Sequence, residues 1–186
     1  MVKSFEFILD DEEDGVYAIS LVDKPAIKEN WLALSESHKI EFKEIDFKEN
    51  ILLGAVLIPD LEILRIDDKT KEIFKIYFSG ETIKKIAHKF MKQGYQSEST
   101  LQHKTKVKGV TVVETWLKED MVHDKSVKYG FDYPLNTWLV SISVDNEEIK
   151  EKVKSGEIKG FSIEGVFNQK SEDQRLFNQL KELLTN

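Results

Sequence analysis

Hydrophobic and polar side chains alternate along much of the chain, which is the pattern of half-buried β-strands. Phe5, Phe7 and Leu9 alternate with polar neighbours, and the acidic run 10–14 with Gly15 predicts a turn before a second extended segment. The same reasoning predicts later strands, which fall at residues 16–22, 39–47, 51–58, 72–78, 110–117, 138–144 and 158–167.

The hydrophobic period changes from two to about 3.6 after residue 79, which indicates a helix. Ser79 is a suitable N-cap and Gly94 a suitable residue just past the end of this helix. A shorter helix is predicted between Asp145, with Glu148 three residues later, and Gly156. A last amphipathic helix is predicted over residues 171–186.

The strands are not regularly interleaved with the helices, which argues against a doubly wound parallel sheet. We expect an α+β, mainly β fold in which a closed antiparallel β-barrel carries flanking helices. The expected organisation is a strand-rich segment 1–50 that packs on or extends a barrel domain 51–170, followed by the helix 171–186. Residues 118–137 lack a clear period and predict a lid or binding loop.

Composition excludes several classes of function. The 186 residues contain no cysteine, which excludes disulfide scaffolds, zinc-thiolate sites and thiol catalysis. A net charge of −7 argues against broad binding of nucleic acid. The longest apolar run, 51–58, is too short to span a bilayer, and acids occupy the N-terminus where a signal peptide needs an apolar core. We therefore expect an intracellular protein without membrane, cofactor or metal.

The acidic turn resembles a calcium loop only superficially. Asp10, Glu12, Asp14 and Gly15 fit the first ligand positions loosely, but Leu21 stands where a bidentate glutamate is needed. We interpret this run as a solvated turn.

Four histidines are candidates for catalysis. His88 lies away from the apolar stripe of its helix, His38 lies in a polar connector, and His123 beside Asp124 is weak evidence for a metal. His103 follows a polar loop and immediately precedes a strand, a position from which its ring could project into a cleft.

A serine between two glycines, in Gly160-Phe161-Ser162-Ile163-Glu164-Gly165, is the second candidate. Glycine in a strand marks a bulge or a close backbone approach, and a nucleophilic serine needs a rigid, exposed setting of this kind. The spacing is not that of the nucleophile elbow of α/β-hydrolases. Ser162 is therefore either a nucleophile or a small residue packed at a barrel corner.

Glu114 is the third candidate. If 110–117 is a regular strand, Glu114 shares the apolar face of Val110, Val112 and Trp116. A carboxylate on a buried face must be paired, so Glu114 could orient a histidine or pair with a lysine at the sheet edge.

Together these segments resemble the XkdF-like phage serine proteases, relatives of tailed-phage prohead proteases and, more distantly, of herpesvirus assemblins. The resemblance covers about residues 51–167 and rests on LLGAVLIPDLEILRID, IYFSGETIKKIAHKF, LQH, VTVVETWL, NTWLVSISV and VKSGEIKGFSIEGVF. It implies an assemblin-like barrel and a serine endopeptidase that matures phage heads by cutting scaffold and major capsid proteins. Its location would then be the assembling procapsid in the host cytoplasm. The apolar stripe of the predicted last helix needs a partner, either within the chain or across a homo-oligomer.

Carried over by position, Ser162 matches the family's nucleophile and His103 its general base. The third member does not transfer, because assemblin-like enzymes use a residue after the serine. Glu172, Asp173 and Glu182 are available there, and Glu114 is better placed by the face argument. The alternative function is a virion or procapsid structural protein that keeps the protease fold without its activity.

Overall fold

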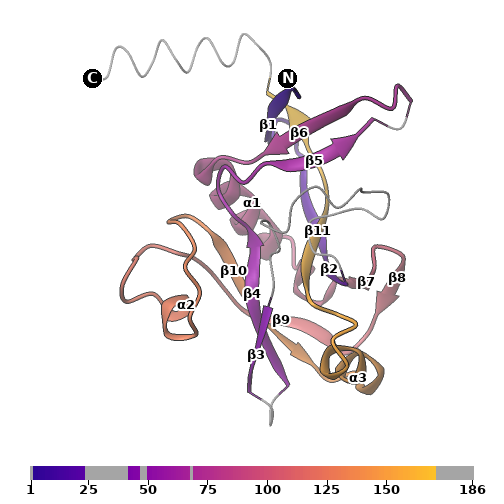
Figure 1. Ribbon diagram of the computed structural model, residues 1–186, viewed down its shortest axis with the longest axis vertical. Coiled ribbons are helices and arrows are strands. Elements are labelled where there is room, and N and C mark those ends of the chain that lie inside the picture. Colours follow the sequence, from indigo (N-terminus) through magenta and orange to yellow (C-terminus); the bar gives the residue numbers. More distant parts are fainter. Residues whose placement is uncertain (1, 24–41, 47–49, 68, 171–186) are drawn as a thin grey trace.

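A computed structural model describes residues 2–23, 42–46, 50–67 and 69–170 (Figure 1). The predicted helix 171–186 and His38 lie outside these residues. The strands are β1 (Ser4–Ile8), β2 (Gly15–Val22), β3 (Phe42–Asp46), β4 (Ile51–Leu57), β5 (Ile63–Ile66), β6 (Ile73–Tyr77), β7 (Ser99–Leu101), β8 (Thr105–Val107), β9 (Val110–Leu117), β10 (Trp138–Val144), β11 (Gly160–Val166) and β12 (Asn168–Gln169). The helices are α1 (Gly80–Lys92), α2 (Lys125–Lys128), α3 (Glu147–Lys154) and the short 3-10 helix η1 (Tyr95–Ser97).

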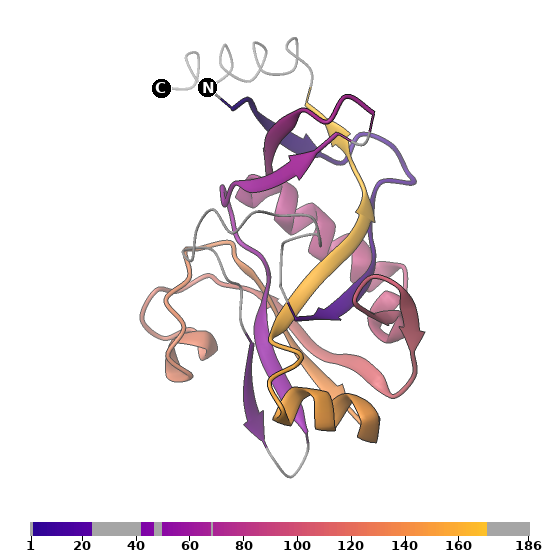
Figure 2. The ribbon, with the colours of Figure 1, turned by 45° about the vertical axis from the view of Figure 1, so that its right-hand side comes forward.

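The strands form three four-stranded sheets, with orders β12-β1-β6-β5, β3-β4-β10-β9 and β11-β2-β7-β8. Among the residues that the structure describes, the fold is mainly β with few helices and no sheet closes into a barrel, so the expected closed barrel is wrong. Most pairings are antiparallel, but β1 pairs with β6, and β2 with β7, in parallel. Figure 2 shows the long β11 crossing in front of α1, from the sheet that contains β2 toward the one that contains β1.

Hydrogen-bonding edges explain why no barrel forms. A strand has two such edges, and β4 uses its edges for β3 and β10. The strand β11 packs against β4, yet among the described residues its ladder runs to β2 instead. The sheets of β4 and β11 therefore meet through side chains, and the described residues form no continuous ring of backbone hydrogen bonds.

One hydrophobic core is shared by the three sheets and α1. The apolar face of α1 buries Ile83, Ile86 and Phe90 against it. Trp138 of β10 is completely buried, and its ring meets that of Phe90 edge-on at 5.4 Å. The helical period read from the sequence thus locates the face that packs on the sheets.

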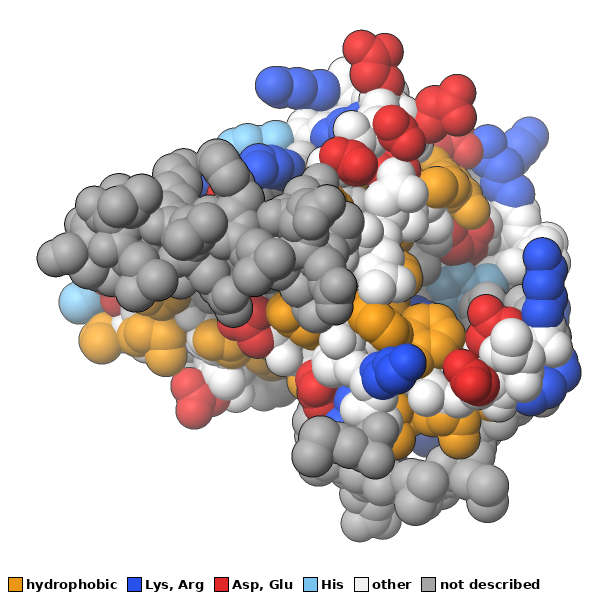
Figure 3. Space-filling view, turned by 90° about the horizontal axis from the view of Figure 1, so that it is seen from above, with side chains coloured by type: hydrophobic (Ala, Val, Ile, Leu, Met, Phe, Trp, Pro, Cys, Tyr) orange, Lys and Arg blue, Asp and Glu red, His pale blue; other side chains and the backbone are white. Residues whose placement is uncertain are grey.

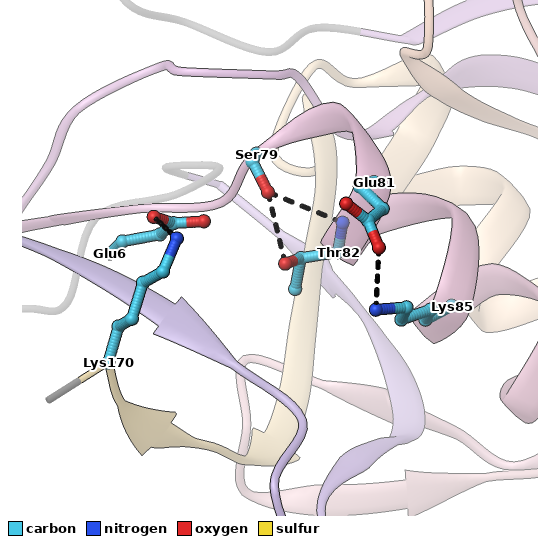
Figure 4. Close-up of polar contacts among 6 residues, drawn as sticks. All are labelled: Glu6, Ser79, Glu81, Thr82, Lys85 and Lys170. Atoms are coloured by element: carbon cyan, nitrogen blue, oxygen red, sulfur yellow. Dashed lines mark hydrogen bonds and ion pairs between the residues drawn. The ribbon is translucent and has the colours of Figure 1, made fainter. Parts of the chain in front are cut away.

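The ends of α1 are those that the sequence predicts. Ser79 is the N-cap, and its Oγ accepts a hydrogen bond from the backbone N–H of Thr82 at 3.4 Å, as Figure 4 shows. Gly94 follows the helix with a left-handed φ of 77°. The predicted start of α3 is wrong by one residue, because Asn146 rather than Asp145 caps it.

The N-terminal strands lie inside the sheets. β1 lies between β12 and β6, and β2 lies between β11 and β7. An ion pair of 2.6 Å joins Glu6 of β1 to Lys170 just after β12, with both side chains largely buried (Figure 4). Residues far apart in the sequence are therefore held together by backbone ladders and by buried charge.

The long connection after β9 contains one short helix, α2. Farther along this connection, the rings of Phe131 and Tyr133 stack with their centroids 5.2 Å apart. Both residues pack with Leu53 and Leu139 on the outer face of the β4–β10 pair. Among the described residues, no helix is long and apolar enough to cross a membrane.

Candidate active site

A cavity of about 340 Å³ lies between β11 and the β5–β6 hairpin. Ser162 and Glu164 of β11 contribute to its wall, and so does His103. The remaining wall is mostly apolar and aromatic, with Phe7, Phe78 and Phe167 among its residues. A mostly apolar cavity with a few convergent polar groups is the usual form of a binding or active site.

The strand β11 presents Ser162 and Glu164 on one face, because side chains two residues apart on a strand point the same way. Ser162 lies opposite Ser20 of β2, and Ser20 lies opposite Thr100 of β7. Residues paired directly across neighbouring strands share a face of the sheet. Three hydroxyl side chains therefore form a row across three neighbouring strands.

His103 belongs to the tight turn between β7 and β8. Gln102 and His103 both have left-handed backbone conformations, with φ of 53° and 57°, and the N–H of Lys104 donates to the carbonyl of Leu101 at 3.0 Å. Two successive positive φ values define a hairpin turn that suits twisted strands. The backbone N–H of His103 also donates to Ser20 Oγ at 2.9 Å, which fixes the turn next to the hydroxyl row.

Glu164 connects the histidine to this row. Its Oε1 lies 3.2 Å from His103 Nδ1, and it also accepts a hydrogen bond from the hydroxyl of Thr100. The Glu164 side chain is 18% exposed and the His103 side chain 30% exposed, so the pair is partly shielded from water. A carboxylate at Nδ1 holds an imidazole in one tautomer and one orientation.

Residue-level reasoning from the sequence did not identify Glu164 as a site residue. The signal was present, because Glu164 stands two residues after Ser162 in a predicted strand and so shares its face. What the sequence lacked was the position of His103, which reaches this face only through the pairing of β7 with β2.

Ser162 and His103 line the same cavity, but the Ser162 hydroxyl makes no hydrogen bond to the His103 ring within the described chain. Catalytic hydrogen bonds in free enzymes are often long and tighten only when substrate binds. The arrangement supplies a hydroxyl, an imidazole and a carboxylate on one wall, which are the groups of acyl-transfer chemistry.

Glu114 lies in a different sheet from His103. Its carboxylate accepts a hydrogen bond from Ser141 at 2.6 Å and forms an ion pair with Lys125. Burial raises the pKa of Glu114, but the bonds from Lys125 and Ser141 outweigh it and leave the pKa below its ordinary value. Of the two roles open to Glu114, the structure shows the pairing with a lysine.

A β-bulge explains why the face argument misplaces Glu114. Ser141 pairs with Glu114, and the next residue, Ile142, pairs with Val112, so Val113 is an extra residue in β9. Val113 is 56% exposed, while Val110 and Val112 before it are buried in the main core. The bulge reverses the alternation, and Glu114 follows Ser141 onto the outer face.

The other candidate groups lie elsewhere. His88 is exposed on α1, as predicted, and His123 is paired with Asp120 at 3.2 Å. Glu172, Asp173 and Glu182 fall outside the described residues. In the part of the chain that the structure describes, no group of three or more His, Asp or Glu residues could hold a metal ion.

The acidic turn has a structural role. The Asp14 carboxylate accepts the backbone N–H groups of Asp10 and Asp11, at 2.8 and 3.0 Å, and the side-chain amide of Asn168 at 2.8 Å. Burial raises the pKa of Asp14, but these hydrogen bonds outweigh it and the pKa lies below its ordinary value. The turn is thereby anchored to β12.

Comparison with known families places the sequence in a family of phage proteins. The model of the family described as "Putative phage serine protease XkdF" matches residues 39–171, which include Ser162, His103 and Glu164. The chain belongs to this family, as its sequence motifs predicted.

A relative among curated proteins is the "Uncharacterized protein YqbD" of Bacillus subtilis (strain 168). It is 25% identical over 184 residues, which cover 88% of this chain and 51% of the relative. The chain thus spans about half the length of that relative. No solved structure is a significant match to this chain.

Proposed function

We propose that this protein is a serine endopeptidase of phage head maturation, with Ser162 as nucleophile, His103 as general base and Glu164 as the orienting acid. The single observation that carries the proposal is the contact of 3.2 Å between Glu164 Oε1 and His103 Nδ1 beside Ser162. The membership of the chain in a family described as phage serine proteases supports the same reaction class.

The bond at Nδ1 assigns the proton-transfer role to the other ring nitrogen, Nε2. In the first step Nε2 takes the Ser162 proton, Ser162 Oγ forms a bond to the scissile carbonyl carbon, and the peptide C–N bond breaks as the amine receives that proton. Water then gives a proton to Nε2 and attacks the acyl-enzyme, which releases the acid product and restores the serine hydroxyl. Glu164 stabilises the imidazolium present between these transfers.

The proposed substrates are the scaffold and major capsid proteins of the same phage, cleaved inside the assembling procapsid in the host cytoplasm. The family resemblance supports this assignment. An enzyme whose substrates are present at high local concentration can act without binding each one strongly.

Ser162→Ala tests the nucleophile. A fluorophosphonate probe should label the wild-type protein at Ser162, because such probes react with activated serine hydroxyls, and cleavage of co-expressed scaffold and capsid proteins should accompany labelling. We expect Ser162→Ala to abolish labelling and to reduce cleavage by about a million-fold. The control is Ser155→Ala. The Ser155 hydroxyl lies at the exposed end of α3, away from the cavity, so this variant should keep both labelling and cleavage.

A catalytically silent structural protein of the virion or procapsid is the second candidate. It is favoured by the lack of a Ser162–His103 hydrogen bond among the described residues. A wild-type protein that incorporates into procapsids but neither reacts with the probe nor cleaves the capsid proteins would establish this alternative and refute the protease.

A further inference from the structure

A single arginine stands in the wall of the same cavity. The chain has 27 lysine and arginine residues, and only Arg65 and Arg175 among them are arginine. Arg65 lies on β5, where Ile63 and Arg65 share a strand face, and both residues line the cavity that contains Ser162. Arg65 therefore lines the cavity of the proposed active site.

Arg65 has no carboxylate partner in the described part of the chain. Its Nη1 donates to the adjacent backbone carbonyl of Leu64 at 3.0 Å. Glu164, the carboxylate among the described lining residues, is already bonded to Thr100 and His103. Arg65 is partly buried, and removal from water lowers its pKa. A shielded charge is costly unless a ligand or a neighbour pairs with it.

Arg65 is the only lysine or arginine among the described residues that line the cavity. Seen from above, acidic and basic side chains lie side by side on the described surface (Figure 3). A negatively charged group that binds at Arg65 must therefore enter the cavity itself. Arginine suits this task because its planar fork donates two parallel hydrogen bonds to one carboxylate.

We propose that Arg65 binds the carboxylate of an acidic side chain of the peptide substrate, and that it selects peptides with glutamate or aspartate close to the scissile bond. Ile63 and Phe78, which line the same cavity, would pack against the methylene groups of that side chain. The selectivity for cleavage rests on the proposed function, whereas the binding of the carboxylate can be measured without any cleavage.

Binding is tested on the Ser162→Ala protein labelled with ¹⁵N. Two arginines give a simple spectrum of arginine Nε–H signals, and Arg65→Lys identifies the Arg65 signal. The probes are three mixtures of short N-acetylated peptides that differ in the central residue and in the C-terminus: glutamate with a C-terminal amide, glutamine with a C-terminal amide, and glutamine with a free C-terminal acid.

The glutamate mixture should shift the Arg65 signal and should bind about 10-fold or more tightly than the amidated glutamine mixture. Equal binding of the two amidated mixtures would overturn the proposal. So would a response to the free-acid mixture alone, because Arg65 would then recognise a chain terminus.

Selectivity is tested by digesting a proteome-derived peptide library and reading the cleavage sites by mass spectrometry. Wild-type protein should enrich acidic residues at one position, and Arg65→Gln should reduce this enrichment about 10-fold while cleavage of other peptides continues. The control is Lys75→Gln on the neighbouring strand β6, which removes a positive charge that is paired with Glu62.

The two tests separate the two proposals. If the wild-type protein cleaves nothing while the glutamate peptides still shift the Arg65 signal, the protease assignment fails and the binding site stands. If cleavage occurs with the same acidic preference in Arg65→Gln, the protease stands and the role of Arg65 is refuted.

Discussion

His103 illustrates how backbone conformation places a side chain. A non-glycine residue with φ of 57° is uncommon, and such conformations persist where surrounding contacts hold them. Here the bond from the His103 N–H to Ser20 and that from the Gln102 N–H to Leu21 hold the turn against β2. The imidazole is thereby held within reach of Glu164, although 61 residues separate them.

Glu164→Gln tests the orienting role at this scale. Glutamine keeps the shape of the side chain but loses the charge that stabilises an imidazolium, so we expect kcat/KM to fall by about 10²- to 10⁴-fold. The matched control is Glu114→Gln, which removes the acid of the other sheet and should leave kcat/KM unchanged. Equal losses in the two variants would contradict the assignment of Glu164.

Bulges decide which way side chains point along two of the strands. In β9 the extra residue Val113 turns Glu114 away from the core, and between β11 and β2 the register shifts after Glu164. At the second shift Gly165 lies close to its neighbours. A Cβ at this position would stand 2.5 Å from the carbonyl oxygen of Gly15 and 2.8 Å from the Phe167 ring.

Gly165→Ala should therefore destabilise the protein and disturb the site together. The methyl group must displace β11 from β2, at a cost of about 1–3 kcal/mol in the free energy of unfolding, measured by urea denaturation. Fluorophosphonate labelling of Ser162 should slow as well, because β11 carries the serine.

Gly156→Ala is the control for this experiment. Gly156 has a left-handed φ of 72° but open space around it, so alanine should cost about 1 kcal/mol in stability and leave the labelling rate unchanged. A Gly165→Ala protein with wild-type stability would contradict the close approach.

At the scale of the whole molecule, contacts between the beginning and the end of the described chain hold two sheets together. Asp14 binds Asn168, and Glu6 pairs with Lys170. Asn168 lies in β12 and Lys170 just after it, and β12 follows β11 after one residue, so these contacts hold the β1 sheet and the β2 sheet in a fixed relation. The cavity of the proposed site lies where these sheets meet.

Asp14→Asn should make stability less dependent on pH in acid. Because the folded state lowers the pKa of Asp14 below its ordinary 3.8, the ionised carboxylate stabilises the fold above that pH, and this contribution is lost as the pH falls through the lowered pKa. The wild-type protein should exceed Asp14→Asn in free energy of unfolding at pH 7, and the difference should shrink below about pH 4.

Urea denaturation at several pH values measures this difference. Asp10→Asn, which removes an exposed charge from the same turn, is the matched control. A difference between wild type and Asp14→Asn that stays constant from neutral to acid pH would show that the hydrogen-bonded carboxylate is not responsible.

Features encoded by short-range pattern were predictable from the sequence. The helix α1 with its Ser79 cap and Gly94 end, and the strands β4, β9 and β10, follow from period and capping chemistry. The Val113 bulge and the short strands β7 and β8 were not predictable, because pairing with partners elsewhere in the chain creates them.

The sequence alone determined the family and the mainly β composition of the fold, and it proposed Ser162 and His103 as candidate site residues. Only the tertiary structure decided that the three described sheets share a core without closing a barrel, that Glu164 rather than Glu114 meets His103, and that Arg65 lines the same cavity. The physical reason is that side-chain chemistry and periodicity are local properties of the sequence. The neighbour with which each strand pairs depends instead on which distant segment satisfies its backbone hydrogen bonds.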